Sequence, residues 1–231
     1  MNLTYSSYAN ENLVLEGISK DRIIKIGSPL MEVYLENFEK IQKNKICERL
    51  NLKKDKYIIA SIHREENVSN FYNFKVILDS LLKIKDKNKC RIIFSTHPRT
   101  KQKLKEYKNI YKNHIEFHNP FGYLDFVCLM KNSMLVISDS GSISEEASIM
   151  SIPAINIRFA NERQEAMELG TVIMTGICEK NILRSSIIAI EKGKKNIEVH
   201  VDYSKTNVSS AIVAIVQSYT HYIKSKTWFK N

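Results

Sequence analysis

Short apolar runs alternate with amphipathic segments along most of the chain. Runs rich in Ile and Val predict strands at residues 57–62, 91–95, 134–138, 153–157 and 171–174. Helical spacing of apolar positions predicts helices at about 71–85, 100–107, 122–131, 142–150 and 179–191. This alternation is typical of βαβ units with right-handed crossovers. We therefore expect one α/β domain over residues 28–205, a doubly wound Rossmann-like parallel sheet.

The two ends of the chain, residues 1–27 and 206–231, lie outside this pattern. The first predicts a helix that ends at Gly17, followed by a short strand. The second predicts an amphipathic helix followed by Trp228 and Phe229. These large apolar side chains need a surface to bury against, so we expect the ends to belong with something other than the α/β domain.

Polar clusters directly follow four of the predicted strands. They are His63–Asn67, His97–Arg99, Asp139–Glu146 and Arg158–Glu165. In open parallel sheets, ligands bind beyond the carboxyl ends of the strands. We therefore expect these clusters to meet at one binding site.

The third cluster ends a strand and opens a helix with small residues, Ser140, Gly141 and Ser142. Unpaired N–H groups and the helix dipole at such a position suit a diphosphate, which small side chains allow to approach. Glu146, in the first turns, would suit the hydroxyls of a ribose. The structural alternative is a plain capped helix, with Ser142 as N-cap and Glu145 completing a capping box.

Composition narrows the class of protein. The 231 residues are 43% hydrophobic and 26% charged, with a formal charge of +10. We expect no nucleic-acid partner, since no recognised binding motif accompanies this charge. The four cysteines have no paired spacing, which predicts neither a metal site nor disulfides. No apolar run approaches the ~20 residues that span a bilayer, and no signal peptide is evident, so we expect a cytoplasmic protein without a membrane partner.

Together the four clusters resemble the non-hydrolysing UDP-N-acetylglucosamine 2-epimerase family. The resemblance covers nearly the whole chain, but only the C-terminal half and linker of the family, whose architecture is the two-domain glycosyltransferase B type. Ser142 and Ser144 stand where members acting on UDP-N-acetylglucosamine usually carry glycine and glutamine. The pattern is therefore more similar to the subfamily that forms UDP-N-acetyl-L-fucosamine.

The resemblance implies inversion of a UDP-N-acetyl sugar at C2, by elimination of UDP and its re-addition, without a cofactor or metal. It also implies that the carboxylates handling the C2 proton lie in a domain preceding Met1. Residues 1–27 would then be a remnant of that domain and its linker, and residues 206–231 would pack back on it. The domain could be a separate polypeptide, and the complete protein would be a homo-oligomer.

The resemblance assigns roles to individual residues. Ser140, Gly141 and Ser142 would hold the diphosphate, Glu146 the ribose, and His63 would be the catalytic histidine beside the leaving diphosphate. An imidazole of ordinary pKa near 6.5 could donate a proton there, the alternative being a histidine that caps a turn.

Further residues match the family less closely. Arg163 would contact phosphate, unless it forms a surface ion pair with Glu162 or Glu165. Arg64 and Arg158 are phosphate or inter-domain candidates, with simple salt bridges as the alternative. The remaining candidates are Phe126 against uracil with Tyr123 one turn before it, both of which could instead be core, and His97 and Arg99 near a regulatory or supporting site.

Two other readings stay open. The chain could be a catalytically inactive UDP-binding module or the remnant of a truncated gene. It could also be a glycosyltransferase domain of similar architecture, although His63–Asn67 and Arg158–Glu165 fit the epimerases better.

Overall fold

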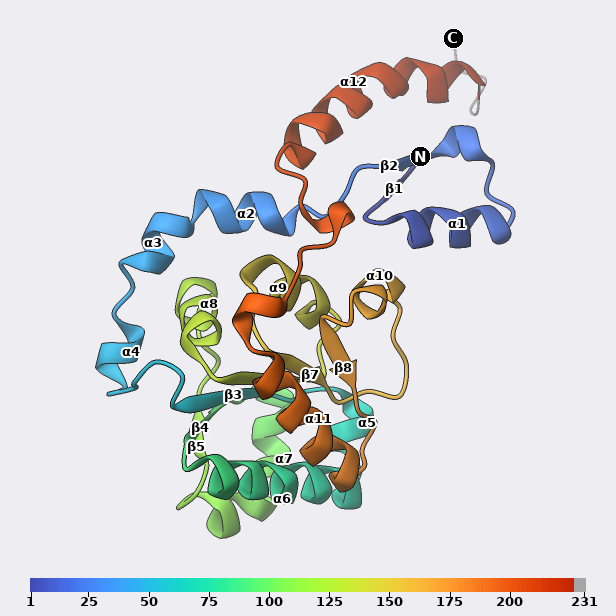
Figure 1. Ribbon diagram of the computed structural model, residues 1–231. Coiled ribbons are helices and arrows are strands. Elements are labelled where there is room, and N and C mark those ends of the chain that lie inside the picture. Colours follow the sequence, from blue (N-terminus) through green and yellow to red (C-terminus); the bar gives the residue numbers. More distant parts are fainter. Residues whose placement is uncertain (227–231) are drawn as a thin grey trace. The chain divides into compact units, whose positions relative to one another are not determined.

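The computed structural model describes residues 1–226, without the side chains of Lys105, Glu106 and Lys108 (Figure 1). Trp228 and Phe229, expected to need a burial surface, lie outside the described residues. The chain forms two compact units. The larger comprises residues 37–199, and the smaller combines residues 1–36 with the segment that begins at His200.

A six-stranded sheet organises the larger unit. Its strands are β3 (Tyr57–Ser61), β4 (Arg91–Ser95), β5 (Glu116–His118), β6 (Leu135–Ser138), β7 (Ala154–Asn156) and β8 (Val172–Met174). They are all parallel, in the order β5-β4-β3-β6-β7-β8. The order reverses between β3 and β6, where Ile58 is in register with Leu135. This confirms the predicted doubly wound sheet and places a switch point beside His63.

Helices cover both faces of this sheet. Figure 1 shows α6 (Phe71–Asn88), α7 (Pro98–Tyr111) and α11 (Glu179–Lys192) on one side, with α8 (Tyr123–Asn132) and α9 (Ile143–Met150) on the other. Shorter helices are α3 (Phe38–Gln42), α4 (Ile46–Arg49), α5 (Glu65–Val68) and α10 (Gln164–Glu168). The core lies between the first face and its helices, where Ile92 and Ile155 are buried with Phe74, Leu78 and Ile182. Burial of this apolar surface is the main force holding the layers together.

The smaller unit joins the two ends of the chain. It contains a parallel pair, β1 (Asn2–Thr4) and β2 (Ile23–Lys25), with helices α1 (Ser7–Leu15), α2 (Leu30–Glu36) and α12 (Val208–Lys226). Lys25 Nζ lies 2.7 Å from the buried Asp202 carboxylate, which also accepts the Ser7 N–H at 2.9 Å. The units divide near residues 36 and 200, whereas the sequence predicts boundaries at 27 and 205. Helix α2 joins the smaller unit through Glu32, which accepts the Ser209 N–H of α12 at 2.9 Å.

Helix α1 ends as predicted. Gly17 has a φ of +87°, and its N–H donates to the Val14 carbonyl at 3.0 Å. The next N–H, that of Ile18, donates to Leu13, which completes a Schellman motif. A residue with a Cβ is strained at this φ, so the glycine fixes the point where the helix stops.

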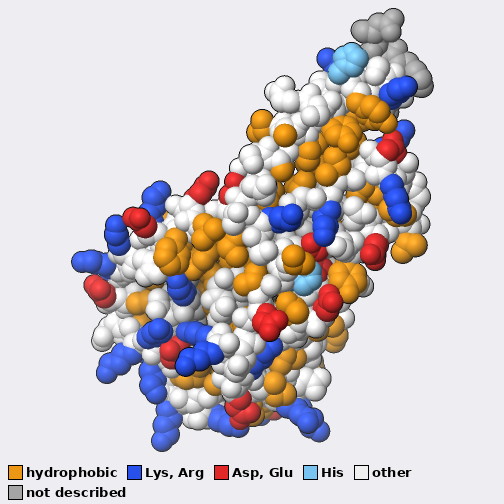
Figure 2. Space-filling view, turned by 45° about the horizontal axis from the view of Figure 1, so that its top comes forward, with side chains coloured by type: hydrophobic (Ala, Val, Ile, Leu, Met, Phe, Trp, Pro, Cys, Tyr) orange, Lys and Arg blue, Asp and Glu red, His pale blue; other side chains and the backbone are white. Residues whose placement is uncertain are grey.

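The apolar side chains of helix α12 are mostly half-buried or exposed. Of its described residues only Val208 is buried. A groove of about 350 Å³ lies between the helix and the first strand, lined by Leu3, Ile215, Tyr219 and neighbouring residues. Figure 2 shows hydrophobic side chains gathered over this part of the chain. No helix of the described residues is long and apolar enough to cross a membrane.

Candidate functional site

The predicted clusters follow β3, β4, β6 and β7, so they lie at the carboxyl edge of adjacent strands. Asp139, directly after β6, is fully buried at the centre of this edge. Its carboxylate accepts the backbone N–H groups of His63 at 3.0 Å and Arg64 at 2.8 Å, and the side-chain amide of Asn67 at 2.9 Å. Asp139 therefore ties the loop after β3 to the loop after β6.

Asp139 and Asn67 were in the motifs but were not assigned a role from sequence. A signal for Asp139 exists, because an aspartate that directly extends an apolar strand is placed for burial. A buried carboxylate must find hydrogen-bond donors. Which donors it finds depends on how the loops fold, and no periodic pattern encodes that.

His63 is held by this carboxylate as well. Its Nδ1 lies 3.3 Å from Asp139 Oδ1, while a third of the side chain stays exposed. Burial lowers the pKa of His63, and the nearby His97, Arg64 and Arg99 add to that effect, against the opposite influence of Asp139. The expectation of an ordinary pKa near 6.5 is therefore wrong, and the free imidazole is neutral at pH 7.

The residues expected near a regulatory site adjoin His63. The ring of His97 lies 5.3 Å from the ring of His63, centre to centre. Arg99 donates from Nη1 to the His63 carbonyl at 3.3 Å and pairs with Glu65. Arg64 donates from Nε to the Asp139 carbonyl at 3.0 Å and pairs with Glu66 at 3.1 Å. The two arginines thus stabilise the conformation of the His63 loop.

The turn between β6 and α9 carries the predicted phosphate cradle. Ser140 and Ser142 lie with their hydroxyl oxygens 2.9 Å apart. Ser142 occupies the N-cap position, but its side chain makes no capping hydrogen bond and instead donates to Glu146 at 3.3 Å. Glu145 pairs with Arg163. The capping-box alternative is therefore wrong, because both of its side chains are engaged elsewhere.

Glu146 sits behind this turn, mostly shielded from solvent. Burial raises its pKa to about 7, against the opposing hydrogen bond from Ser142. The carboxylate consequently gains from any further donor that reaches it, because each hydrogen bond to the charged form offsets part of the desolvation cost.

Two arginines flank Gly141. A Cβ built on Gly141 would lie 3.3 Å from Arg158 Nη1 and 3.9 Å from Arg163 Nε. Arg158 is only 4% exposed and pairs through Nη2 with Glu162 at 2.5 Å. Its Nη1 is buried and has no hydrogen-bond partner among the described residues.

Arg163 pairs with the buried Glu145, a partner that the sequence does not indicate. For Arg158 the salt-bridge alternative holds at Nη2 and leaves Nη1 available. A guanidinium nitrogen that is buried, unbonded and turned toward a glycine at a helix start is suited to an oxyanion.

Tyr123 and Phe126 lie in the first turn of α8. Tyr123 is 41% exposed, and Phe126 is partly exposed. Neither is among the fully buried residues, and the exposure of Tyr123 argues against a core role for that side chain. No group of three or more His, Cys, Asp or Glu side chains that could hold a metal occurs among residues 1–226.

Comparison with known proteins gives consistent matches. A family model described as UDP-N-acetylglucosamine 2-epimerase matches residues 1–217. A UDP-N-acetylglucosamine 2-epimerase of Methanococcus maripaludis is 35% identical over 216 residues, which are 90% of this chain and 58% of the relative. The chain thus spans little more than half the length of the curated relatives it matches.

Solved structures share the fold. The UDP-N-acetylglucosamine 2-epimerase of Rickettsia bellii superposes with a TM-score of 0.90 at 35% identity, covering 100% of this chain and 62% of that one. The Methanocaldococcus jannaschii enzyme, solved in complex with UDP-GlcNAc and UDP, gives a TM-score of 0.81 at 33% identity, covering 91% of this chain and 59% of that one. The resemblance to the UDP-N-acetylglucosamine 2-epimerase family and the glycosyltransferase B type of fold are confirmed.

Proposed function

The chain belongs to the UDP-N-acetylglucosamine 2-epimerase family, and we propose that its larger unit binds UDP in the inversion of a UDP-N-acetyl sugar at C2. One observation carries this proposal. The buried, unbonded Nη1 of Arg158 faces Gly141 at the start of α9, where the helix dipole also favours an anion.

The diphosphate would lie over the turn after β6. Ser140 and Ser142 supply hydroxyls, and Gly141 lets a phosphate oxygen approach the backbone. Arg158 donates from Nη1, and Arg163 lies on the other side of the glycine. Each charge-assisted hydrogen bond of this kind contributes roughly 1.5–3 kcal/mol.

The nucleoside would occupy the neighbouring positions. Glu146 accepts hydrogen bonds from the ribose hydroxyls, which favours its charged form despite burial. Phe126 and Tyr123, whose rings are partly exposed, provide an aromatic surface for uracil. Arg64 and Arg99 support this site from the His63 loop rather than binding the nucleotide.

In the proposed reaction a base takes the C2 proton while the C1–O bond breaks and UDP leaves with its electron pair. UDP then re-adds to C1 of the resulting glycal, and a proton reaches the opposite face of C2. His63 would donate a hydrogen bond to the departing diphosphate. Because Nδ1 faces Asp139, the nitrogen left for this task is Nε2.

We propose that the base for C2 comes from a preceding domain or a separate polypeptide. The chain covers only 58% of its relative from M. maripaludis, so the activity of a whole protein is not carried over to it directly. The uncovered groove beside α12 offers an apolar surface on which such a segment could dock. Homo-oligomeric assembly and a cytoplasmic location stay predictions.

The sugar remains a choice between two classes. Named relatives act on UDP-N-acetylglucosamine, whereas Ser142 and Ser144 resemble the subfamily that forms UDP-N-acetyl-L-fucosamine. An inactive UDP-binding module is the second candidate function, favoured by the pairing of Glu65 and Glu66, beside His63, with Arg99 and Arg64.

Calorimetry with UDP and UMP tests the binding proposal. We expect UDP to bind more tightly, because its second phosphate reaches the Arg158 side of the turn. Equal affinities would overturn the phosphate assignment. ADP serves as the control for the base, and we expect it to bind more weakly than UDP.

A further inference from the structure

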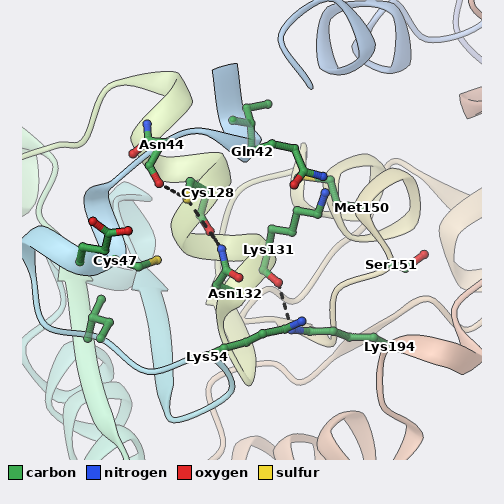
Figure 3. A pocket seen from close by; sticks show the side chains of 13 residues that line it. Gln42, Asn44, Cys47, Lys54, Cys128, Lys131, Asn132, Met150, Ser151 and Lys194 are labelled. Atoms are coloured by element: carbon green, nitrogen blue, oxygen red, sulfur yellow. Dashed lines mark hydrogen bonds between the residues drawn. The ribbon is translucent and has the colours of Figure 1, made fainter. Parts of the chain in front are cut away.

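A second cavity lies in the larger unit, at the amino edge of the sheet. Its volume is about 540 Å³. Lys54, Asn132 and Ser151 line it, and they precede β3, β6 and β7 along the chain, so the cavity is at the opposite edge from the candidate UDP site. Figure 3 shows side chains from α3, α4 and α8 around it.

Two cysteines meet in this cavity. Cys47 belongs to α4 and Cys128 to α8, and the two helices pack against each other. Both thiols line this one cavity. Cys47 Sγ also lies 3.6 Å from the Tyr57 hydroxyl, and Cys128 Sγ lies 3.8 Å from the Asn44 carbonyl. Spacing in the sequence gave no hint of this pair, because 80 residues separate its members.

The two thiols differ in accessibility and acidity. Cys47 is partly exposed, whereas Cys128 is buried. The hydrogen bond from Cys128 lowers the pKa of Cys47 to about 6, against burial and the charge of Glu48. The same interaction, together with burial, raises the pKa of Cys128. Cys47 is therefore both the more acidic and the more accessible thiol of the pair.

The charges facing the pair favour an anion. Lys54, Lys131 and Lys194 line the cavity, and Glu48 is its acidic lining residue. Lys194 also pairs with Asp55 at 2.5 Å, and Lys131 lies over the Phe38 ring. The cavity beside Cys47 thus combines a positive lining with enough volume for a small molecule.

We propose that Cys47 and Cys128 form a thiol–disulfide exchange site for anionic low-molecular-weight disulfides. The Cys47 thiolate attacks one sulfur of the disulfide and releases one thiolate, leaving a mixed disulfide on Cys47. Cys128 gives up its proton and attacks the Cys47 sulfur, which releases the second thiolate. The protein gains a Cys47–Cys128 disulfide, and the small disulfide is reduced to two thiols.

The other two cysteines provide contrasts. Cys90 is buried in the core, and burial raises its pKa to about 11, so it is unreactive. Cys178 is exposed and would react without a neighbouring thiol to resolve the adduct. A Cys178→Ser variant removes this background while leaving the cavity intact.

The test uses 5,5′-dithiobis(2-nitrobenzoic acid), an anionic disulfide, on the Cys178→Ser chain at pH 6.5. We expect release of two thionitrobenzoate anions per chain and a final protein mass without an adduct. Peptide mapping without reductant should recover a Cys47–Cys128 link. A persistent adduct on Cys47 while Cys128 is present would overturn the proposal.

Two additional substitutions in the same background separate the roles. Cys128→Ala should release one anion and keep a stable adduct on Cys47. Cys47→Ala should slow release by roughly tenfold or more, because the accessible thiolate is lost. An unchanged rate in Cys47→Ala would also overturn the proposal, provided that circular dichroism shows a folded chain. Neither result depends on UDP binding or epimerisation.

Discussion

The buried carboxylate of Asp139 contacts His63 twice, through the backbone N–H at 3.0 Å and through the ring Nδ1 at 3.3 Å. A single charged group thus fixes both the position of the loop and the orientation of the imidazole. Since His63 is neutral at pH 7, the contact at Nδ1 requires a proton on that nitrogen. We therefore expect Nε2 to be an acceptor in the free protein and to gain a proton when an anion approaches.

Asp139→Asn should reverse this tautomer. The amide oxygen would keep the backbone donors, so its NH₂ group would face Nδ1 and leave the ring proton on Nε2. Nitrogen-15 NMR of the imidazole should show the change, and the free energy of unfolding should fall by about 1–3 kcal/mol. Glu66→Gln, an exposed carboxylate change on the same loop, is the control. An unchanged tautomer in folded Asp139→Asn would contradict the positioning role.

The long elements could be predicted from sequence because their burial is periodic. Helix α6 buries Phe74, Ile77, Leu78, Leu81 and Ile84 at helical spacing. In contrast, β5 has three residues of which none is fully buried, and α5 and α10 have four and five residues. Elements this short contain too few residues to show a periodic pattern of burial, and contacts with the surrounding chain determine whether they form.

Site residues that directly follow a strand could be predicted from the sequence. Contacts between loops that fold back on each other could not. His63 and the turn at Gly141 follow apolar strands directly. The Glu145–Arg163 pair joins residues 18 positions apart across a strand and two loops. No spacing rule indicates that pair, and the sequence offers nearby carboxylates such as Glu162 as equally suitable partners for Arg163.

Gly141→Ala should weaken UDP more than UMP. The added Cβ would lie 3.3 Å from Arg158 Nη1, in the space where a phosphate oxygen would bind. We expect the ratio of the two affinities to fall by roughly tenfold, equivalent to about 1.4 kcal/mol. Gly122→Ala is the matched control, because a Cβ there meets nothing within 4 Å. Equal losses for both nucleotides would move the second phosphate away from Arg158.

Glu146→Ala should weaken UDP by about 1.5–3 kcal/mol, the range for a hydrogen bond to a charged group. The comparison ligand is the 2′-deoxy form of UDP, measured by calorimetry with both proteins. If Glu146 accepts the 2′ hydroxyl, the losses of binding free energy caused by the substitution and by the missing hydroxyl should not add up. Strict additivity would place that ribose contact elsewhere.

Glu146 also predicts a pH dependence of stability. Its pKa is raised from 4.5 to about 7 in the folded chain, so folding disfavours the charged form. The stability of the wild type relative to Glu146→Gln should therefore be constant below about pH 4.5 and should fall as the pH rises to about 7. Urea unfolding at pH 5 and pH 8 should show a change in this difference of roughly 2–3 kcal/mol. Glu191→Gln, an exposed change on α11, should show none.

The chain alone should bind UDP-N-acetyl sugars without exchanging the C2 proton. Most acidic side chains around the site are already engaged: Asp139 with backbone donors, Glu65 with Arg99, Glu66 with Arg64, Glu145 with Arg163 and Glu162 with Arg158. Glu146 accepts from Ser142 and is assigned to the ribose. A base must be free to face C2, and losing such a group typically costs about 10²–10⁴-fold in rate.

Incubation in heavy water with each candidate UDP-sugar measures this directly. We expect no deuterium at C2 with the chain as the sole protein, and detectable deuterium after addition of the N-terminal segment of a longer relative that assembles with it. His63→Gln should then reduce the restored exchange, because the departing diphosphate loses its donor. Exchange by the chain alone would show that its own side chains supply the base, and Glu65 and Glu66, beside His63, would be the first to replace.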